Sequence, residues 1–310
     1  MNPRSGASTG KKSMLAGFLL ERLLERDDYA ACWEGRRGAT RARIVIPHRS
    51  LLSDTRVRAA FLRRGYSFES LANPMLLRVV DVGRDGEDCY VALEEIAGVL
   101  LDELLTIWSD AGVCMPYPLA ARIGVELAQA LSEFQRVYHP REGRRKLHGD
   151  LTPRGIVLTP NGNVQLVPPC LSDVVELARH EAGSLRLAYK APEQLRNTWA
   201  RPEIDERADV FALGVVLWEL VAGRRVGNYR PTLKLLGAVA AAQPPRIESL
   251  RPDVPAALSR IIERCLRRSV QERPSGPDEL ASALTDAVPD MASNAELARA
   301  VQAVAAGGSV

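Results

Sequence analysis

The chain has 310 residues, of which 46% are hydrophobic, and its formal net charge is +3. A chain of this kind can bury a full core, and its length fits one large domain or two smaller ones. Because 41 basic residues nearly balance 38 acidic ones, the charge gives no reason to expect nucleic acid or an anionic membrane as a partner.

The cysteines and the apolar runs exclude further classes. The five cysteines form no C-x-x-C pair and have no zinc-type histidine spacing, so neither a metal site nor a disulfide framework is expected. No run of about 18 apolar residues is present, which argues against insertion into a membrane. We expect a cytoplasmic protein.

The predicted elements begin after a small, polar and basic tail at residues 1–12, which we expect to be disordered. Short strand-like runs at 42–46 and 90–93 flank one helical stretch at 57–71. This pattern predicts a small, mostly β unit that ends near residue 97.

The rest of the chain is helical by pattern. Residues 118–137 place their apolar side chains on one helical face, as an amphipathic helix does. Residues 210–220 carry no charge except Glu219, so a helix there must be buried on nearly every side. Further helices are predicted at 256–266, 277–285 and 294–305.

Four short strings follow one another in a fixed order. They are HGDLTP at 148–153, YKAPE at 189–193, ADVFALG at 208–214 and ERP at 272–274. In this order they resemble the catalytic loop, the end of the activation segment, the central C-lobe helix and the closing arginine of protein kinases. The resemblance runs from about Leu19 to Leu284 and is to the eukaryotic-like Ser/Thr kinases of bacteria.

The resemblance implies an α+β fold of two lobes, protein-kinase-like, with a small β-rich N-lobe and a larger helical C-lobe. The N-lobe is expected over residues 13–97 and the C-lobe over 98–288. A C-terminal helical extension is expected at 289–310.

Residues unlike those of the family stand where its glycine-rich loop would be. Glu25, Asp27 and Ala30 take the three glycine positions if Cys32 and Trp33 match the family's Val-Tyr pair. Two carboxylates at these positions would repel a triphosphate. Alternatively, the turn swings outward and its acids are solvated.

The family's lysine and glutamate pair is also missing. Val45 stands where the phosphate-pairing lysine belongs, and Arg64 replaces the glutamate that holds it. Arg43 lies two residues before Val45 on the same face of the strand. It either fills the adenine pocket, contacts a ligand or, as we expect, turns to solvent.

In the catalytic loop, Asp150 stands at the position of the base, but its expected helpers differ. Thr152 replaces a lysine, and Gly155 replaces a metal-binding asparagine. Pro168 replaces the aspartate of the metal motif, and its side chain has no carboxylate for magnesium. We therefore expect Asp150 to be a structural residue or a relic.

The activation segment departs from the family as well. Arg186 takes the place of the substrate-positioning threonine, and Gly149 replaces the arginine that receives an activation-loop phosphate in many members. Switching by phosphorylation of this segment is therefore not expected.

The matching residues are those that hold the fold. Glu193 and Arg273 resemble the family's buried ion pair between the activation segment and the C-lobe. Asp209 resembles the aspartate that accepts hydrogen bonds from the catalytic-loop backbone, and His148 resembles the packing histidine of that loop.

These substitutions lead to the expectation of a pseudokinase that is not an enzyme and has no cofactor or metal. It would act as a scaffold or an allosteric regulator on a protein partner, another signalling protein, in bacterial signalling. One alternative is a module that binds nucleotide without turnover, through hinge-like residues 93–96. Another is a kinase-like fold with non-standard transferase activity, for which Asp173 is the nearest replacement acid.

Overall fold

A sheet of six antiparallel strands forms the smaller of two lobes, with the strand order β1-β2-β3-β4-β6-β5. In the computed structural model the described residues are 13–137, 147–172, 174, 185–195, 204–226 and 244–306. The expected disorder of residues 1–12 lies outside them. The strands are β1 (Ser13–Leu15), β2 (Phe18–Arg26), β3 (Ala30–Arg37), β4 (Thr40–Pro47), β5 (Val79–Asp85) and β6 (Asp88–Glu94).

The two faces of this sheet are buried in different ways. Along β4, Ala42 and Ile44 alternate with more exposed residues and join Phe18 and Tyr90 in a small core on one face. The short helix α1 (Arg49–Leu52) and the longer α2 (Thr55–Glu69) lie over the sheet, and Phe61 and Phe68 of α2 are buried in the main core. The predicted strands and the predicted helix of the N-lobe are confirmed.

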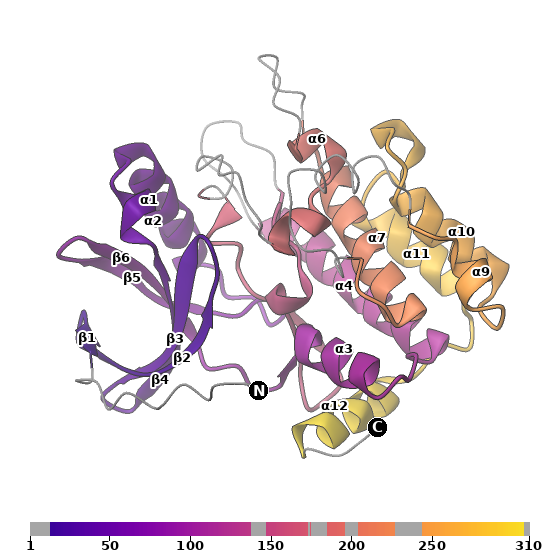
Figure 1. Cartoon of the computed structure of the whole chain (residues 1–310), viewed down its shortest axis with the longest axis horizontal. Helices are drawn as coiled ribbons and strands as arrows, with labels where there is room; N and C mark the ends of the chain where they lie inside the picture. Colours follow the sequence, from indigo (N-terminus) through magenta and orange to yellow (C-terminus); the bar gives the residue numbers. More distant parts are fainter. Residues whose placement is uncertain are drawn as a thin grey trace, which may run out of the picture.

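The larger lobe is mainly helical and lies beside the sheet, as Figure 1 shows. Its longer helices are α3 (Leu101–Asp110), α4 (Tyr117–Val137), α7 (Arg207–Ala222), α10 (Ala256–Cys265), α11 (Pro277–Ala287) and α12 (Asn294–Ala305). Its shorter segments are η1 (Pro153–Gly155), η2 (Leu185–Tyr189), α6 (Pro192–Leu195), α9 (Ile247–Leu250) and η3 (Val270–Glu272). The α+β fold of two lobes is therefore confirmed.

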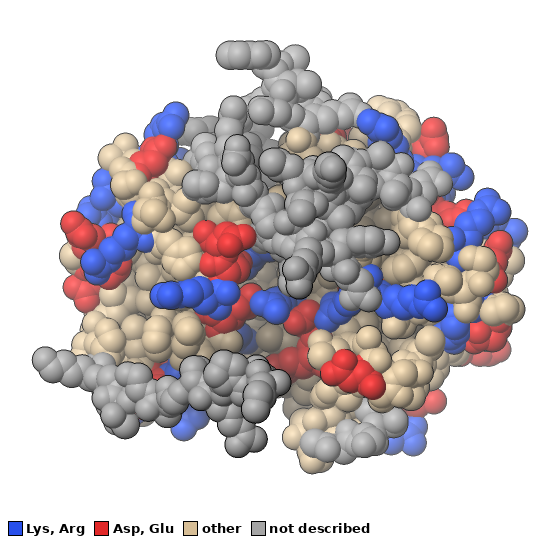
Figure 2. All heavy atoms as spheres, in the orientation of Figure 1, with Lys and Arg blue, Asp and Glu red and all other residues tan. Residues whose placement is uncertain are grey.

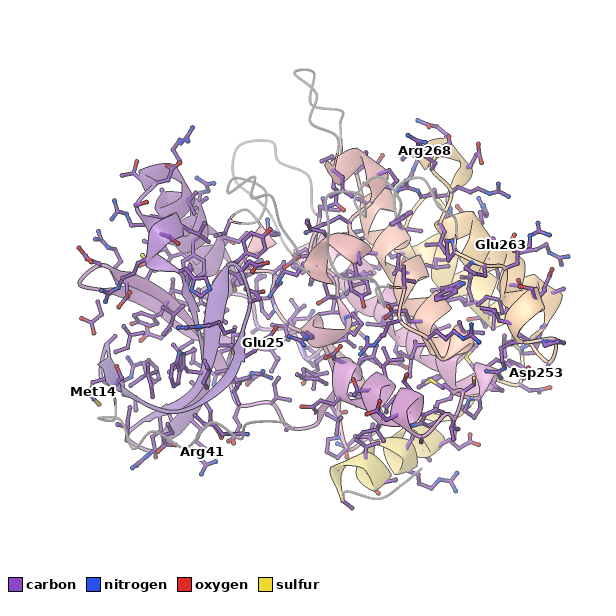
Figure 3. All side chains as sticks on the ribbon, in the orientation of Figure 1. Met14, Glu25, Arg41, Asp253, Glu263 and Arg268 are labelled. Carbon is purple, nitrogen blue, oxygen red and sulfur yellow. The ribbon has the colours of Figure 1, made fainter. Side chains whose placement is uncertain are left out.

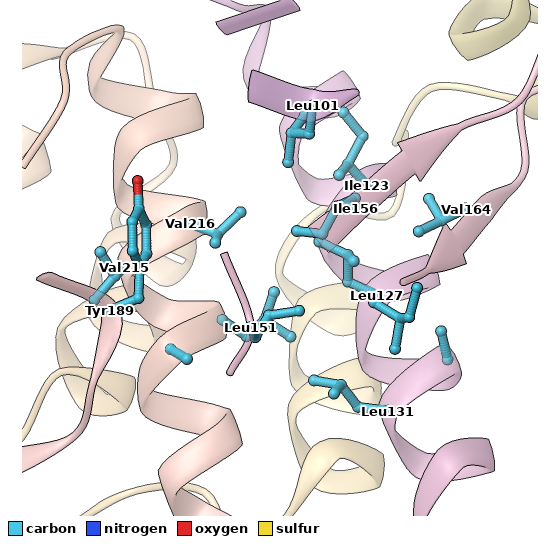
Figure 4. Close-up of a cluster of buried hydrophobic side chains, with 14 of the residues drawn as sticks. Leu101, Ile123, Leu127, Leu131, Leu151, Ile156, Val164, Tyr189, Val215 and Val216 are labelled. Atoms are coloured by element: carbon cyan, nitrogen blue, oxygen red, sulfur yellow. The ribbon is translucent and has the colours of Figure 1, made fainter. Parts of the chain in front are cut away.

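Helix α7 is the centre of the C-lobe. All residues from Ala208 to Ala222 are buried, including Glu219, as its nearly uncharged sequence predicts. Leu127 and Leu131 of α4 and Val215 and Val216 of α7 belong to one apolar cluster (Figure 4). This cluster supports the loop that carries Asp150.

A small second sheet extends this support. Strands β7 (Val99–Leu100), β8 (Ile156–Leu158) and β9 (Val164–Leu166) pair in that order. They flank the segment that contains residues 147–155, so the loop is held between this sheet and α7. None of the described helices combines the length and the apolar character that crossing a bilayer requires.

The ion pair of Glu193 and Arg273 forms as the resemblance implies. Two guanidinium nitrogens of Arg273 lie 2.7 and 2.9 Å from the carboxylate oxygens of Glu193. Arg273 also donates to the backbone carbonyls of Arg207 and Arg267, and its side chain has no exposed surface. One residue thereby joins α6, α7 and the segment before η3.

We predict that Arg273→Ala lowers the free energy of unfolding by about 3–5 kcal/mol, because it leaves the Glu193 carboxylate buried without its cation. Denaturant unfolding followed by circular dichroism measures the change. Arg246→Ala is the control, since Arg246 makes a mostly exposed pair with Glu263 and should change stability by less than about 1 kcal/mol. Equal losses in the two variants would contradict the assignment.

Candidate functional site

A cleft between the two lobes gathers most of the residues that the resemblance singles out. Its walls include Glu25, Asp27, Val45, Asp150 and Pro168. Figure 2 shows basic and acidic side chains interleaved where the lobes meet, and Figure 3 labels Glu25 at this boundary. The cleft is therefore the candidate functional site.

Asp150 lies at the floor of the cleft and is held by two cations. Its side chain is 3% exposed, with Lys190 Nζ 3.0 Å and Arg186 Nη1 2.5 Å from its two oxygens. Burial alone would raise the pKa of Asp150, but Lys190 and Arg186 outweigh that cost and lower it. The carboxylate is thus ionised and neutralised by the activation segment.

The loop around Asp150 is fixed from below by Asp209. The carboxylate of Asp209 accepts hydrogen bonds from the backbone N–H groups of His148 and Gly149, at 2.9 and 2.8 Å. Gly149 has φ +73°, a left-handed conformation that favours glycine over the arginine of other family members. Burial raises the pKa of Asp209 to about 6 against the effect of these two N–H groups.

The turn between β2 and β3 closes over the cleft. Asp27 Oδ1 accepts from the N–H groups of Tyr29 and Ala30, and Asp27 Oδ2 accepts from Arg186 Nε at 2.8 Å. His48 Nε2 lies 2.6 Å from the carbonyl oxygen of Asp27. The alternative in which the acids of this turn are solvated is wrong, because Asp27 lies against the activation segment.

Glu25 makes a second contact of the same kind. It pairs with Arg154, whose Nε also lies 3.1 Å from Asp102 Oδ2 at the start of α3. Asp102 in turn accepts from Arg225, which pairs with the buried Glu219. A row of alternating charges thus runs from the N-lobe turn to helix α7.

Arg64 has a contact that the family's glutamate would not make. It is buried on α2, and its Nη2 donates to the backbone carbonyls of Leu147 and His148 at 3.1 and 3.2 Å. The position of the family's glutamate, which would pair with the lysine, therefore ties α2 to the catalytic loop instead. Val45 faces the cleft, as the resemblance implies.

The expectation that Arg43 turns to solvent is wrong. Arg43 is half-buried and lines the cleft beside Cys32, because strand alternation places it on the same face as Val45. The cavity that remains has a volume of about 90 Å³. Pockets for drug-sized ligands are roughly 300–1,000 Å³, so the enclosed space of the cleft is narrow by comparison.

Thr152, Gly155 and Pro168 also line the cleft. Within the described parts of the chain, no group of three or more histidine, cysteine or acidic side chains has the arrangement of a metal site. Asp173, the proposed replacement acid, lies outside the described residues. The roles that the resemblance gives to these positions stay predictions.

Three charged residues of the cleft were missed at the sequence level: Lys190, Arg154 and Asp102. Lys190 lies inside the YKAPE string, next to Tyr189, whose hydroxyl contacts Glu219. A buried aspartate needs a cation, and this rule could have pointed to a cationic partner for Asp150 had its burial been predicted. Arg154 and Asp102 carry no such signal, because the contacts of Arg154 with Asp102 and Glu25 form only when η1, α3 and the N-lobe turn meet in the folded protein.

Comparison with known proteins agrees with this geometry. A family model described as protein tyrosine and serine/threonine kinase matches residues 23–281. The chain belongs to the protein kinase family. The tyrosine-protein kinase MasK of Myxococcus xanthus is 28% identical over 222 residues, covering 69% of this chain and 33% of that protein. The serine/threonine-protein kinase PkaA of Streptomyces coelicolor is 29% identical over 280 residues, covering 83% of this chain and 48% of that protein.

The solved structures show the same fold. The PknI kinase domain of Mycobacterium tuberculosis superposes with a TM-score of 0.66 at 22% identity, covering 90% of this chain and 99% of that domain. The chain spans a third to a half of the length of the curated relatives MasK and PkaA. The bacterial kinase resemblance is confirmed.

The expectation that the chain is not an enzyme is wrong. The kinase family is a family of enzymes, and the relatives are named as tyrosine or serine/threonine kinases. Matching single positions to a motif also considers each side chain alone, whereas in the folded protein the ionised carboxylate of Asp150 lines the cleft at the family's base position.

We predict that Arg64→Met loosens α2 from the catalytic loop, because two buried carbonyl groups lose their charged donor. The free energy of unfolding should fall by about 1–3 kcal/mol, and hydrogen exchange should accelerate in both α2 and residues 147–150. Arg56→Met is the matched control, since Arg56 begins the same helix with an 81% exposed side chain. Equal effects of the two substitutions would refute the tether.

Proposed function

We propose that this protein is a kinase-family signalling protein that acts by binding a protein partner in a bacterial cell, as a scaffold or an allosteric regulator. The observation that carries the proposal is the pairing of charges inside the cleft. Asp27 and Glu25 of the N-lobe are paired with arginines of the C-lobe, and only about 90 Å³ of free volume remains.

The contacts that maintain the shape of the C-lobe support the same proposal. The Glu193–Arg273 pair and the hydrogen bonds to Asp209 are complete, with distances of 2.7 to 2.9 Å. Such contacts preserve the surface on which a partner would dock. The partner would be another signalling protein.

Phosphorylation of a protein substrate is the second candidate function. It is favoured by the ionised carboxylate of Asp150, which lines the cleft at the family's base position. The kinase names of the relatives favour it too. This function requires the lobes to separate enough for ATP to enter, because charge pairs cross the narrow cleft in this conformation. Binding of nucleotide without turnover would need the same opening.

Two measurements on the purified chain distinguish these functions. Ligand binding to the native state must appear as increased stability, so a thermal-shift titration with ATP, with and without magnesium, detects nucleotide entry. Transfer of labelled phosphate to the chain itself or to a generic protein substrate detects kinase activity. A magnesium-dependent rise in melting temperature with ATP would show that the cleft opens to nucleotide and would favour the kinase function, whereas no rise would favour the partner-binding proposal.

The partner itself is sought by affinity capture of the tagged chain from its native cells. Charge reversals on the surface that the partner protects should weaken association without lowering the melting temperature, because rim charges tune binding more than folding. The proposal fails if the chain is recovered alone while the purified protein transfers phosphate. Asp150→Asn is not used for this test, since it would leave Lys190 and Arg186 without their shared anion.

A further inference from the structure

Two arginines of the C-lobe each bridge one carboxylate of their own lobe and one of the N-lobe. Arg186 lies between Asp150 and Asp27, at 2.5 and 2.8 Å. Arg154 lies between Asp102 and Glu25. The two N-lobe carboxylates lie within two residues of each other, at the end of β2 and in the turn that follows it, so both bridges hold the same piece of the N-lobe.

The C-lobe ends of these bridges are fixed independently of the N-lobe. Asp150 is held by Lys190 as well as by Arg186, and Asp102 is held by Arg225, whose other nitrogen contacts Glu219. Both arginines would therefore stay in place if the N-lobe moved away. Of the four ion pairs that these two arginines make, the pairs with Asp27 and Glu25 are the ones that cross between the lobes and would break.

The N-lobe end is also rigid. The turn that contains Asp27 is closed by a backbone hydrogen bond from Asp27 N to Ala30 O at 3.0 Å, and His48 lies against the carbonyl of Asp27. A rigid turn transmits the position of Asp27 to strands β2 and β3. The bridges therefore hold the whole sheet, and not only the tip of the turn, in place relative to the catalytic loop.

The four side chains of the two interlobe ion pairs are partly exposed to solvent, so the pairs can form in the closed cleft and can also separate into water. Those of Asp27 and Arg186 are 18% and 24% exposed, whereas those of Glu25 and Arg154 are 23% and 43% exposed. Partly exposed pairs contribute less than buried ones. Separating them re-solvates four charged groups, so opening does not leave a charge buried without a partner.

We propose that Arg186 and Arg154, with Asp27 and Glu25, form an interlobe latch that holds the cleft closed, and that its release opens the cleft. The proposed latch is a separate inference and does not depend on whether the chain binds the protein partner proposed above. It is a regulatory contact between the C-lobe and the N-lobe turn, independent of any phosphate group.

A double-mutant cycle monitored by hydrogen exchange tests the latch. Asp27→Asn keeps the shape and the hydrogen-bond acceptor for Tyr29 and Ala30 but removes the charge that pairs with Arg186. Exchange should accelerate at least about fivefold on both sides of the cleft, in residues 27–32 and in residues 148–152. Arg186→Gln should do the same, and adding Asp27→Asn to it should accelerate exchange no further, because Arg186→Gln already removes the contact to Asp27 along with the one to Asp150.

A carboxylate that pairs only within the N-lobe supplies the control for Asp27→Asn. Glu34→Gln removes a carboxylate of the same sheet that pairs with Arg22, 2.8 Å away, inside the N-lobe, and it should leave exchange at residues 148–152 unchanged. The latch is disproved if Asp27→Asn affects only the N-lobe turn. It is also disproved if the two substitutions act additively, since Arg186 would then serve Asp150 alone.

Discussion

The buried carboxylate of Asp150 is the constraint on which the arrangement of the cleft depends. A carboxylate that is 3% exposed must be neutralised, and in this chain both cations come from the activation segment, as Lys190 and Arg186. Satisfying one charge therefore draws that segment onto the catalytic loop. Because a guanidinium group has more donors than one carboxylate uses, Arg186 has a nitrogen left for Asp27 of the opposite lobe.

The same principle explains why the cleft is narrow. In related kinases a lysine and a glutamate join sheet and helix within the N-lobe, and the cleft stays available for ligand. Here Val45 makes no such pair, Arg64 joins α2 to the backbone of the catalytic loop, and Arg186 and Arg154 join the sheet to the C-lobe. Cross-lobe contacts thus replace contacts within a lobe, and they cross a cleft with a cavity of about 90 Å³.

The sequence predicted the fold well, because each element carries its own signal. Helix α7 is apolar on nearly every side, α4 is amphipathic, and the strings around Asp209 and Arg273 identify the kinase-like arrangement. The site was predicted only in part. Asp150 and Arg186 were singled out as positions, but their pairing with Asp27 and Lys190 depends on three segments that meet only in the folded protein. Arg43 was misplaced because strand alternation puts it on the face of Val45 but does not say whether its long side chain stays in the cleft or turns out of it.

The latch has a direct chemical reporter in the cleft. Cys32 lines the cavity beside Arg43, whereas Cys114 is exposed on the C-lobe, so the ratio of their alkylation rates measures cleft opening with an internal reference. Burial raises the pKa of the Cys32 thiol, which slows its reaction while the lobes stay together. Peptide mapping after timed alkylation should show that Asp27→Asn increases the Cys32 to Cys114 rate ratio at least about fivefold. An unchanged ratio in a folded Asp27→Asn protein would contradict the account.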